Sequence, residues 1–348
     1  MSAVHQLLPA AAPHDAITAQ AFGWRDLLRE WGHESEIVAE HVHPEMLGAV
    51  LQLNRAGKRL VNEGAVLLRY ALWSATAETA LRARGPVALC YHNITPGDLL
   101  RDFNPGLADL CDRGRAALTG FRGKIDALVA DSSFNAAELR DAGLGEATVV
   151  PLLLQLPEEV PRRAPNREPV VVIVGRIVPN KRLEDAIKSF TLYQRRHAPE
   201  ASLVMVGSAV GFEGYRTALE ILIARLGTRN VFFTGPISSE ARDAWYSRAD
   251  VYLSMSVHEG FCAPLIEALA HGVPVVARGA GAVPETVADA GVVLDEADFP
   301  LAAEALHELA SSPSTRNALY DAADRRLAEL RPAVLAPRIR AALAPVLR

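Results

Sequence analysis

Two carboxylates, Glu259 and Glu267, stand eight positions apart in the stretch HEGFCAPLIE at residues 258–267. Glu259 precedes a glycine, whereas Glu267 falls in an apolar run with helical spacing. Because an unpaired buried carboxylate is costly, the pair indicates that something polar binds there. Rise-per-residue geometry separates the two groups by about 10 Å, which suits the opposite ends of one extended ligand. Carboxylates accept hydrogen bonds from pairs of sugar hydroxyls.

The elements around this stretch support such a site. Residues 250–256 (DVYLSMS) are predicted to be a strand, Pro264 suits the first helical position and Gly272 suits the helix stop. The amides of residues 260–263 would then be available to an anion at the helix N-terminus. The alternative is that Glu259 only caps the helix and Glu267 only reaches solvent.

A second candidate is GRIVPNK, residues 175–181, where an apolar strand ends. Gly175 closes the strand, and Arg176 and Lys181 precede a helix. Two cations beside a helix N-terminus favour a pyrophosphate. The alternative is that these cations pair with Glu184 and Asp185 on a solvated face.

A third candidate is TGPISSE, residues 234–240, a loop between a strand and a helix that Ser238 or Ser239 caps. Its backbone at Pro236 and Ile237 is a candidate edge for a nucleobase. Taken alone, this loop carries little information.

Short β-rich runs alternate with helical patterns along the whole chain, which predicts parallel sheets covered by helices. In the first half, strands are expected at 3–8, 35–42, 65–72, 86–92, 127–134 and 147–154, with a turn at 9–16 and a helix at 17–32. In the second half, strands are expected at 169–175, 201–207, 230–235, 250–256 and 273–278, with helices at 183–196, 215–227, 239–249 and 264–272. Ser132 or Ser133 is expected to cap a further helix near residue 135.

This alternation predicts an α/β fold of two Rossmann-like, doubly wound domains that face a cleft. The proline-rich, charged segment 157–169 is predicted to link a first domain, 1–156, to a second, 170–329. The alternative for 157–169 is a long loop inside one domain. Residues 330–348 have a composition that permits a C-terminal helix crossing back to the first domain.

Composition narrows the class of protein. The 348 residues are about twice a typical domain, and 50% of them are hydrophobic. A formal net charge of -5 gives no electrostatic case for nucleic-acid binding. The sequence start lacks a secretory signal pattern, no run approaches the roughly 20 apolar residues that span a bilayer, and the three cysteines have no metal-type spacing. These features predict a cytoplasmic protein, and the Ala- and Arg-rich composition is typical of a bacterial one.

Together, GRIVPNK and HEGFCAPLIEALAHGVPVVARGAGAVPE resemble the retaining glycosyltransferases of family 4, which have the GT-B fold and an E-x7-E motif. The resemblance covers roughly residues 170 to 295, and it is specific because the motifs occur in order at the right spacing. In the first half it is weaker and rests on HQLLPAAAPHDAI and on YHNITP. It makes the first domain the acceptor side and the second the nucleotide-sugar side.

The resemblance implies a role for each matching residue. Glu259 would bind hydroxyls of the donor sugar and Glu267 the ribose, while Arg176 and Lys181 would hold the pyrophosphate and stabilise charge on the leaving group. The donor-binding set is Gly175, Arg176, Lys181, Pro236, Ile237, Glu259, Gly260, Phe261, Cys262, Ala263 and Glu267. The catalytic set is His92, Arg176, Lys181 and Glu259. The acceptor-side set is Pro13, His14, His92 and Asn93, with His92 facing the donor or, alternatively, lying in the core.

The activity implied is a metal-independent, retaining, hexosyltransferase-type transfer from a UDP- or GDP-linked sugar to a hydroxyl acceptor, with no other cofactor. Nucleobase, sugar, acceptor and oligomeric state stay open. Departures from the family pattern are His14 in the first loop, Cys262-Ala263 for Gly-Leu, and Ala280-Gly281 for Gly-Gly before Glu285. The alternatives are a non-catalytic nucleotide-binding subunit and a sugar-nucleotide 2-epimerase. Basic residues at 101, 113, 115, 122 and 124 predict solvated helix faces, with contact to an anionic membrane as the alternative.

Overall fold

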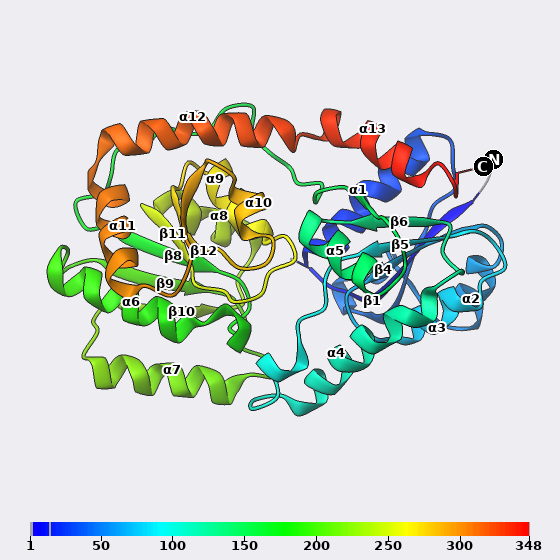
Figure 1. Ribbon diagram of the computed structural model, residues 1–348, viewed down its shortest axis with the longest axis horizontal. Helices are drawn as coiled ribbons and strands as arrows, with labels where there is room; N and C mark the ends of the chain where they lie inside the picture. The colour runs from blue at the N-terminus through cyan, green and yellow to red at the C-terminus, as the bar shows by residue number, and fades with distance from the viewer. Residues whose placement is uncertain (1–2, 14, 348) are drawn as a thin grey trace. The chain divides into compact units, whose positions relative to one another are not determined.

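The computed structural model describes residues 3–13 and 15–347, and its contacts divide the chain into two compact units. Unit 1 comprises residues 1–97, 107–155 and 330–348, and unit 2 comprises residues 98–106 and 156–329. Each unit is an α/β domain built on one parallel sheet (Figure 1). His14, one of the predicted acceptor-side residues, lies outside the described residues.

Unit 1 has a seven-stranded sheet in the order β3-β2-β1-β4-β5-β6-β7. Its strands are β1 Val4–Ala11, β2 Ile37–Val42, β3 Leu51–Gln52, β4 Ala65–Tyr70, β5 Val87–Tyr91, β6 Ala127–Ala130 and β7 Thr148–Val149. Its helices are α1 Ala16–Glu30, α2 Arg55–Val61, α3 Ala75–Leu81, α4 Pro105–Ala117, α5 Ser133–Asp141 and α13 Pro332–Leu343, with short 3-10 turns at Pro44–Met46, Gly97–Leu99 and Leu118–Phe121. The strand order reverses between β1 and β4, which is the switch point of a doubly wound sheet.

Unit 1 differs from the sequence expectation near its first strand. β1 runs through Ala11, because Ala10 and Ala11 continue the pairing with His41 and Val42 of β2. The turn predicted at residues 9–16 therefore starts later, at Ala12. The short edge strand β3 and the helix α2 were not predicted, since a two-residue strand leaves no alternating pattern to detect.

Helix α13 belongs to unit 1, where it packs beside β6 (Figure 1). Leu335, Ile339 and Leu343 on one side of α13 are fully buried in the same apolar cluster as Trp24 of α1 and Val129 of β6. Spacing of three to four residues puts these side chains on one helix face. The end of the chain thus supplies part of the core of the first unit.

Unit 2 has a six-stranded sheet in the order β10-β9-β8-β11-β12-β13. Its strands are β8 Val170–Val174, β9 Ser202–Val206, β10 Val231–Gly235, β11 Val251–Ser254, β12 Val275–Arg278 and β13 Gly291–Leu294. Its helices are α6 Leu183–Arg196, α7 Glu213–Leu226, α8 Ser239–Arg248, α9 Ala263–Ala270, α10 Val283–Val287, α11 Phe299–Ser311 and α12 Pro313–Glu329, with a 3-10 turn, η4, at Pro179–Lys181. Here the order reverses between β8 and β11, so these two neighbours form the switch point.

The predicted linker, residues 157–169, is fastened to unit 2. Arg163 donates through Nη2 to the backbone carbonyls of Tyr246, Ala249 and His271, each at 3.2 Å. The backbone amide of Asn166 donates to Asp250 at 2.8 Å, and the side-chain amide of Asn166 donates to the same carboxylate at 2.9 Å. Side-chain bonds to several elements make this segment part of the second domain rather than a loose connection.

Residues 98–106 also group with unit 2, although they lie inside the span predicted as the first domain. Phe103 packs edge-on against Tyr215 of α7 with ring centroids 5.2 Å apart. Asn104 donates to the carbonyl of Gly211 at 3.0 Å. Such a side-chain docking is a tertiary feature, which the local sequence pattern does not encode.

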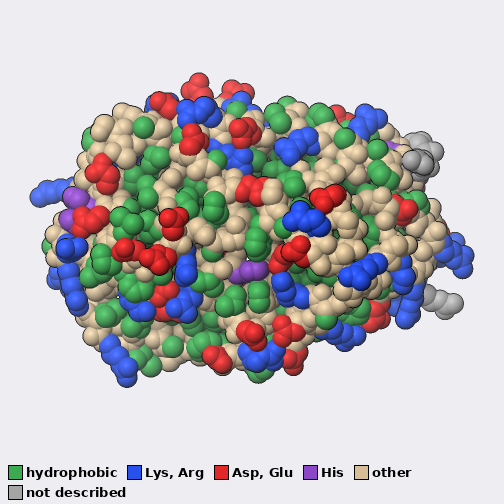
Figure 2. Space-filling model, in the orientation of Figure 1, with side chains coloured by type: hydrophobic (Ala, Val, Ile, Leu, Met, Phe, Trp, Pro, Cys, Tyr) green, Lys and Arg blue, Asp and Glu red, His purple; other side chains and the backbone are tan. Residues whose placement is uncertain are grey.

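Three of the basic residues predicted to lie on solvated helix faces have protein partners. Arg115 pairs with Glu138 at 2.8 Å, Arg113 lies 3.8 Å from Glu78, and Arg122 donates to the carbonyl of Ala142. Figure 2 shows Lys and Arg side chains interspersed with Asp and Glu on the visible face. These pairings agree with solvated helix faces. No helix among the described residues is long and apolar enough to cross a membrane.

Candidate active site at the carboxyl end of the second sheet

An ion pair joins the loops that follow β8 and β11. Lys181, in the η4 turn after β8, places its Nζ 2.6 Å from Oε1 of Glu259, in the loop after β11. β8 and β11 are hydrogen-bonded neighbours at the switch point, so their carboxyl ends lie side by side. That is where ligands bind in open parallel sheets. Glu259 therefore does not cap α9, and the capping alternative is wrong for this residue.

Backbone and amide contacts fix both loops relative to each other. The Val257 amide donates to the carbonyl of Asn180 at 2.9 Å, and the Asn180 side chain donates back to the carbonyl of His258 at 3.4 Å. On the other side, the Ala282 amide donates to the carbonyl of Glu259 at 2.9 Å. The site is thus held by the polypeptide backbone and not only by its two charged side chains.

Gly281 makes a close approach that only glycine permits. Its φ is 57°, and a Cβ there would stand 2.3 Å from the carbonyl oxygen of Glu259. A side chain would therefore push against the backbone that carries the carboxylate. The close contact and the positive φ together account for a glycine at position 281.

The charge of Lys181 is retained in a mostly enclosed place. Burial by itself lowers the pKa of Lys181, but attraction to Glu259 and their hydrogen bond outweigh it and raise the pKa above its ordinary value. The side chain of Lys181 is 21% exposed and that of Glu259 8%. A cation that is charged yet partly accessible suits contact with a ligand phosphate.

The predicted alternative for the GRIVPNK cations is wrong for Lys181. Glu184 and Asp185 instead pair with Arg182, at 3.1 and 2.9 Å. Arg176 is exposed, and its guanidinium lies 5.6 Å from the ring centroid of Phe212. Gly175 ends the strand as expected, with a φ of 146°.

The start of α9 presents backbone amides beside this pair. Cys262 is the N-cap residue with φ 65°, a left-handed conformation that is uncommon for a residue other than glycine. Phe261, Cys262 and Ala263 are buried, and Thr286 bonds the carbonyl of Phe261 at 2.6 Å. The first amides of a helix have no acceptor within the helix, so they can meet an anion. Burial and the neighbouring Glu259 raise the pKa of the Cys262 thiol, which keeps it protonated.

Glu267, one turn inside α9, is held by two residues of α8. Tyr246 donates its hydroxyl to Oε2 at 2.9 Å, and Nη1 of Arg242 lies 3.4 Å from Oε1. The alternative that Glu267 only reaches solvent is therefore wrong. Sequence reasoning missed both partners; their spacing of four residues on one predicted helix was the available signal.

The loop that leads into α8 agrees with the capping expectation. Ser238 accepts a hydrogen bond from the Ala241 amide at 3.2 Å and is the N-cap of α8. Pro236 is exposed and Ile237 is half-buried. Their proposed contact with a nucleobase stays a prediction.

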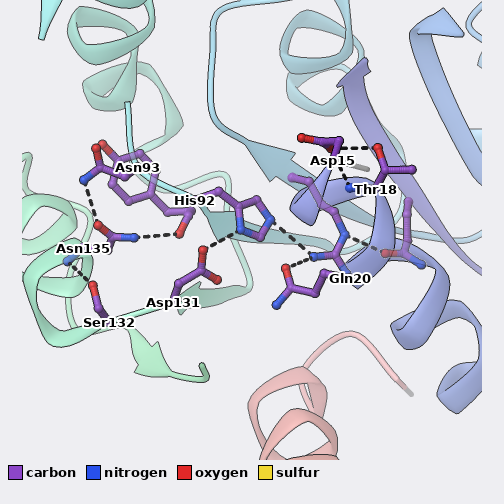
Figure 3. A network of polar contacts seen from close by, with 11 residues as sticks. Asp15, Thr18, Gln20, His92, Asn93, Asp131, Ser132 and Asn135 are labelled. Atoms are coloured by element: carbon purple, nitrogen blue, oxygen red, sulfur yellow. Dashed lines mark hydrogen bonds and ion pairs between the residues drawn. The ribbon is translucent and has the colours of Figure 1, made fainter. Parts of the chain in front are cut away.

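In unit 1, His92 lies in a buried polar network at the carboxyl end of the first sheet (Figure 3). Its Nδ1 lies 2.8 Å from Asp131, and its Nε2 lies 3.3 Å from Nη1 of Arg69. Because a guanidinium only donates, Nε2 is the accepting nitrogen and Nδ1 carries the proton toward Asp131. The side chain of His92 is 2% exposed. Both ring nitrogens thus have protein partners, and a role facing the donor stays a prediction.

The same network contains the other described acceptor-side residues or their neighbours. Asn93 has φ 71° and donates to Asn135 at 2.8 Å (Figure 3). Pro13 lies in the turn before α1, whose N-terminus is capped by Asp15 through the Thr18 amide at 2.8 Å. Ser132 caps α5 by accepting from the Asn135 amide at 3.1 Å, as one of the two predicted serines.

Comparison with known proteins follows the same boundary between the units. Residues 158–326 match the family model described as glycosyl transferases group 1. A GDP-mannose-dependent alpha-(1-6)-phosphatidylinositol monomannoside mannosyltransferase of Mycolicibacterium smegmatis is 34% identical over 156 residues, 42% of this chain and 39% of that protein. An MMP alpha-(1->4)-mannosyltransferase of Mycolicibacterium hassiacum is 31% identical over 186 residues, 52% of this chain and 44% of that protein. The chain thus aligns with less than half the length of these relatives.

Solved structures resemble the whole chain. Anabaena HepE in complex with UDP-glucose superposes with a TM-score of 0.77 at 16% identity and covers 99% of this chain. WaaG, a glycosyltransferase involved in lipopolysaccharide biosynthesis, superposes with a TM-score of 0.73 at 14% identity over 99% of this chain. The fold is therefore the GT-B fold of two doubly wound α/β domains, as predicted.

Proposed function

We propose that this protein is a retaining glycosyltransferase that moves a sugar from a nucleotide-sugar donor to a hydroxyl acceptor. The observation that carries the proposal is the Lys181–Glu259 contact of 2.6 Å at the switch point of the second sheet. A cation and a carboxylate meet there beside the open N-terminus of α9. The match of residues 158–326 to glycosyl transferases group 1 supports the same reaction class.

The groups divide the donor between them. Lys181, the exposed Arg176 and the first amides of α9 are proposed to bind the diphosphate, because all of them favour an anion. Glu259 is proposed to accept hydrogen bonds from sugar hydroxyls and Glu267 from the ribose. Donor binding would place phosphate oxygens beside Lys181, which then bridges the diphosphate and Glu259.

In the proposed reaction, the bond between the anomeric carbon and the phosphate oxygen breaks. A bond forms from the same face to the acceptor oxygen, and the acceptor proton passes to the departing diphosphate. Lys181 and Arg176 stabilise the negative charge that develops on that diphosphate. These two cations supply the charge that a metal supplies elsewhere, so the proposal includes metal independence.

His92 keeps its predicted role toward the donor in this proposal. Its ring nitrogens contact Asp131 and Arg69, which would hold the imidazole in one orientation. Asn93 and the turn at Pro13 remain the proposed acceptor side.

GDP-mannose is the first donor to test, because relatives matching this half of the chain are named for it. UDP-glucose is the second, because the similar HepE structure contains it. The experiment measures release of GDP or UDP by the purified chain, with and without a mixture of sugar and lipid-linked hydroxyl acceptors. We expect slow release without acceptor, by hydrolysis, and faster release with one.

The matched variants are Lys181→Ala and Lys188→Ala. Lys188 lies on α6 in the same unit and pairs with Asp185 instead of Glu259. The proposal predicts loss of release in the first variant and retention in the second. No release from either donor by the wild-type protein, or equal release by both variants, would contradict the proposed donor site. Release in the absence of acceptor speaks against the non-catalytic alternative.

A further inference from the structure

Two side chains of α8, Arg242 and Tyr246, contact the Glu267 carboxylate, and neither has a role in the proposed reaction. Arg242 and Tyr246 stand four residues apart on α8, so both face the same side of that helix. The Tyr246 hydroxyl reaches Oε2 of Glu267 at 2.9 Å, and Arg242 Nη1 reaches Oε1 at 3.4 Å. Each carboxylate oxygen therefore has its own partner from the neighbouring helix.

Tyr246 is built as a rigid, neutral donor. Its side chain is fully buried, and its ring stacks on His271 with centroids 5.0 Å apart and on Tyr252 with centroids 6.3 Å apart. Burial, together with the neighbouring Glu267, raises the pKa of Tyr246 well above its ordinary value. The hydroxyl thus keeps its proton and donates a hydrogen bond to Glu267. A buried hydroxyl in a fixed ring holds its partner in one direction.

Arg242 supplies the charge at the other oxygen. It also pairs with Asp243 at 2.9 Å, so its guanidinium is shared between two carboxylates. The Glu267 side chain remains 23% exposed. A carboxylate has about four acceptor positions, and the described residues supply one partner to each oxygen of Glu267, so each oxygen can accept one more hydrogen bond from a ligand. Two open positions on adjacent oxygens match two adjacent hydroxyl donors.

We propose that Tyr246 and Arg242 are positioning residues that aim the Glu267 carboxylate at the 2′,3′-diol of a nucleotide ribose. They would thereby set the affinity for the nucleotide part of the donor. The inference rests on the proposed function, since it assigns the ribose to Glu267. It adds that α8 carries both the orientation of this carboxylate and, through its Ser238 cap, the adjoining loop proposed for the nucleobase.

A thermodynamic cycle tests this arrangement. Calorimetry measures binding of GDP and of 2′,3′-dideoxy-GDP, and likewise of UDP and its dideoxy form, to the wild-type protein and to Tyr246→Phe. We expect the wild-type protein to prefer the nucleotide with the diol by at least about tenfold. Tyr246→Phe is expected to weaken GDP or UDP binding about tenfold while changing dideoxy-nucleotide binding by less than about twofold.

Tyr320→Phe is the control, because Tyr320 is a buried tyrosine of the same unit whose hydroxyl contacts Arg316 and Arg163 and not Glu267. It should keep the wild-type preference for the diol. Arg242→Gln repeats the test at the more exposed end, with a smaller loss of the preference expected. Melting temperatures of the variants show that each is folded before binding is compared.

The outcomes distinguish a failure of the proposed function from a failure of the positioning roles. If no nucleotide binds the wild-type protein, the proposed function fails. If nucleotides bind the wild-type protein with a diol preference that Tyr246→Phe and Arg242→Gln both retain in full, the proposed function stands and the positioning roles are overturned.

Discussion

The switch points of the two sheets differ in how deeply each buries its charged side chain. In unit 1, Arg69 of β4 bonds Gln6 of β1 at 2.8 Å, and its guanidinium lies 4.6 Å from the Trp24 ring centroid. Arg69 is 0% exposed. In unit 2, Lys181 and Glu259 also join the loops of two neighbouring strands, but Lys181 keeps 21% exposure. The cation of unit 1 lies on a strand and is fully buried, whereas the cation of unit 2 lies in a loop and keeps part of its surface exposed.

This difference in burial suggests that Arg69 serves mainly the stability of unit 1 and that Lys181 serves mainly ligand binding in unit 2. A buried cation costs free energy unless its surroundings compensate it, and Arg69 is compensated by Gln6, Gln20 and the Trp24 ring, although its Nη2 has no hydrogen-bond partner among the described residues. The Lys181–Glu259 pair is mostly enclosed, but the exposed part of Lys181 remains available to a ligand. Substitutions at the two switch points should therefore have different effects, and four predictions test that contrast.

The largest effect is expected at the second switch point. Lys181→Ala and Glu259→Ala should each lower the rate of nucleotide-sugar turnover by about 10²–10³-fold, because each removes a charge proposed to contact the donor. The far-ultraviolet circular dichroism of both variants should match the wild-type protein. Steady-state turnover near the wild-type rate in either variant would break the contrast.

Arg69→Met should act on stability instead. Losing the guanidinium leaves Gln6, Gln20 and His92 without their shared donor, which should cost about 3 kcal/mol of unfolding free energy. Urea unfolding followed by tryptophan fluorescence reports mainly on unit 1, where Trp24, Trp31 and Trp73 lie. Nucleotide affinity should change by less than about twofold, since the donor site belongs to unit 2. A large loss of affinity without destabilisation would reverse the assignment.

Gly281→Ala should weaken the site through the backbone. The Cβ of the alanine would stand 2.3 Å from the Glu259 carbonyl oxygen. We therefore expect the free energy of unfolding to fall by about 2 kcal/mol and the turnover of the donor to fall as well. Gly227→Ala is the matched control, because Gly227 has a similar φ of 63° with no atom within 4 Å of a built Cβ. The free energy of unfolding of the control should fall by about 1 kcal/mol, and its turnover should stay at the wild-type rate. Equal effects on turnover in the two variants would show that the contact with Glu259 is unimportant.

The smallest effect uses two cysteines as reporters. Burial raises the pKa of the Cys90 thiol to about 11 in unit 1 and also raises that of Cys262 in unit 2. Both should react slowly with iodoacetamide at pH 8 in the folded protein. A bound nucleoside diphosphate should slow the labelling of Cys262 further and leave that of Cys90 unchanged, as mass spectrometry of the digested protein would show. Protection of Cys90 alone would place the ligand elsewhere.

Much of unit 2 could be predicted from local patterns. The helix expected at 183–196 has those bounds. GRIVPNK and HEGFCAPLIE each follow a strand that the local pattern predicts, and the doubly wound strand order brings these two strand ends together. The edge strand β13 was missed, since its four residues, GVVL, stand beside an acidic turn and give too short a run.

The remaining features depend on contacts between elements. Nothing near Arg69 in the sequence indicates that Gln6 and Gln20 will surround it, because those residues come from a separate strand and helix. The hydrogen bond from Tyr246 to Glu267 likewise forms only when α8 and α9 pack against each other. Sequence periodicity predicts which face of a helix is buried but not which polar group meets it there.

The most direct test of the central claim is the melting temperature of the purified protein with UDP, GDP, ADP or dTDP. A ligand that binds only the folded state at a hundred times its Kd adds about 2.7 kcal/mol, which raises the melting temperature by several degrees. We predict such a shift with GDP or UDP, and its loss in Lys181→Ala but not in Lys188→Ala. No shift with any of the four nucleotides, or a shift that Lys181→Ala retains in full, would contradict a nucleotide-sugar site at the second switch point.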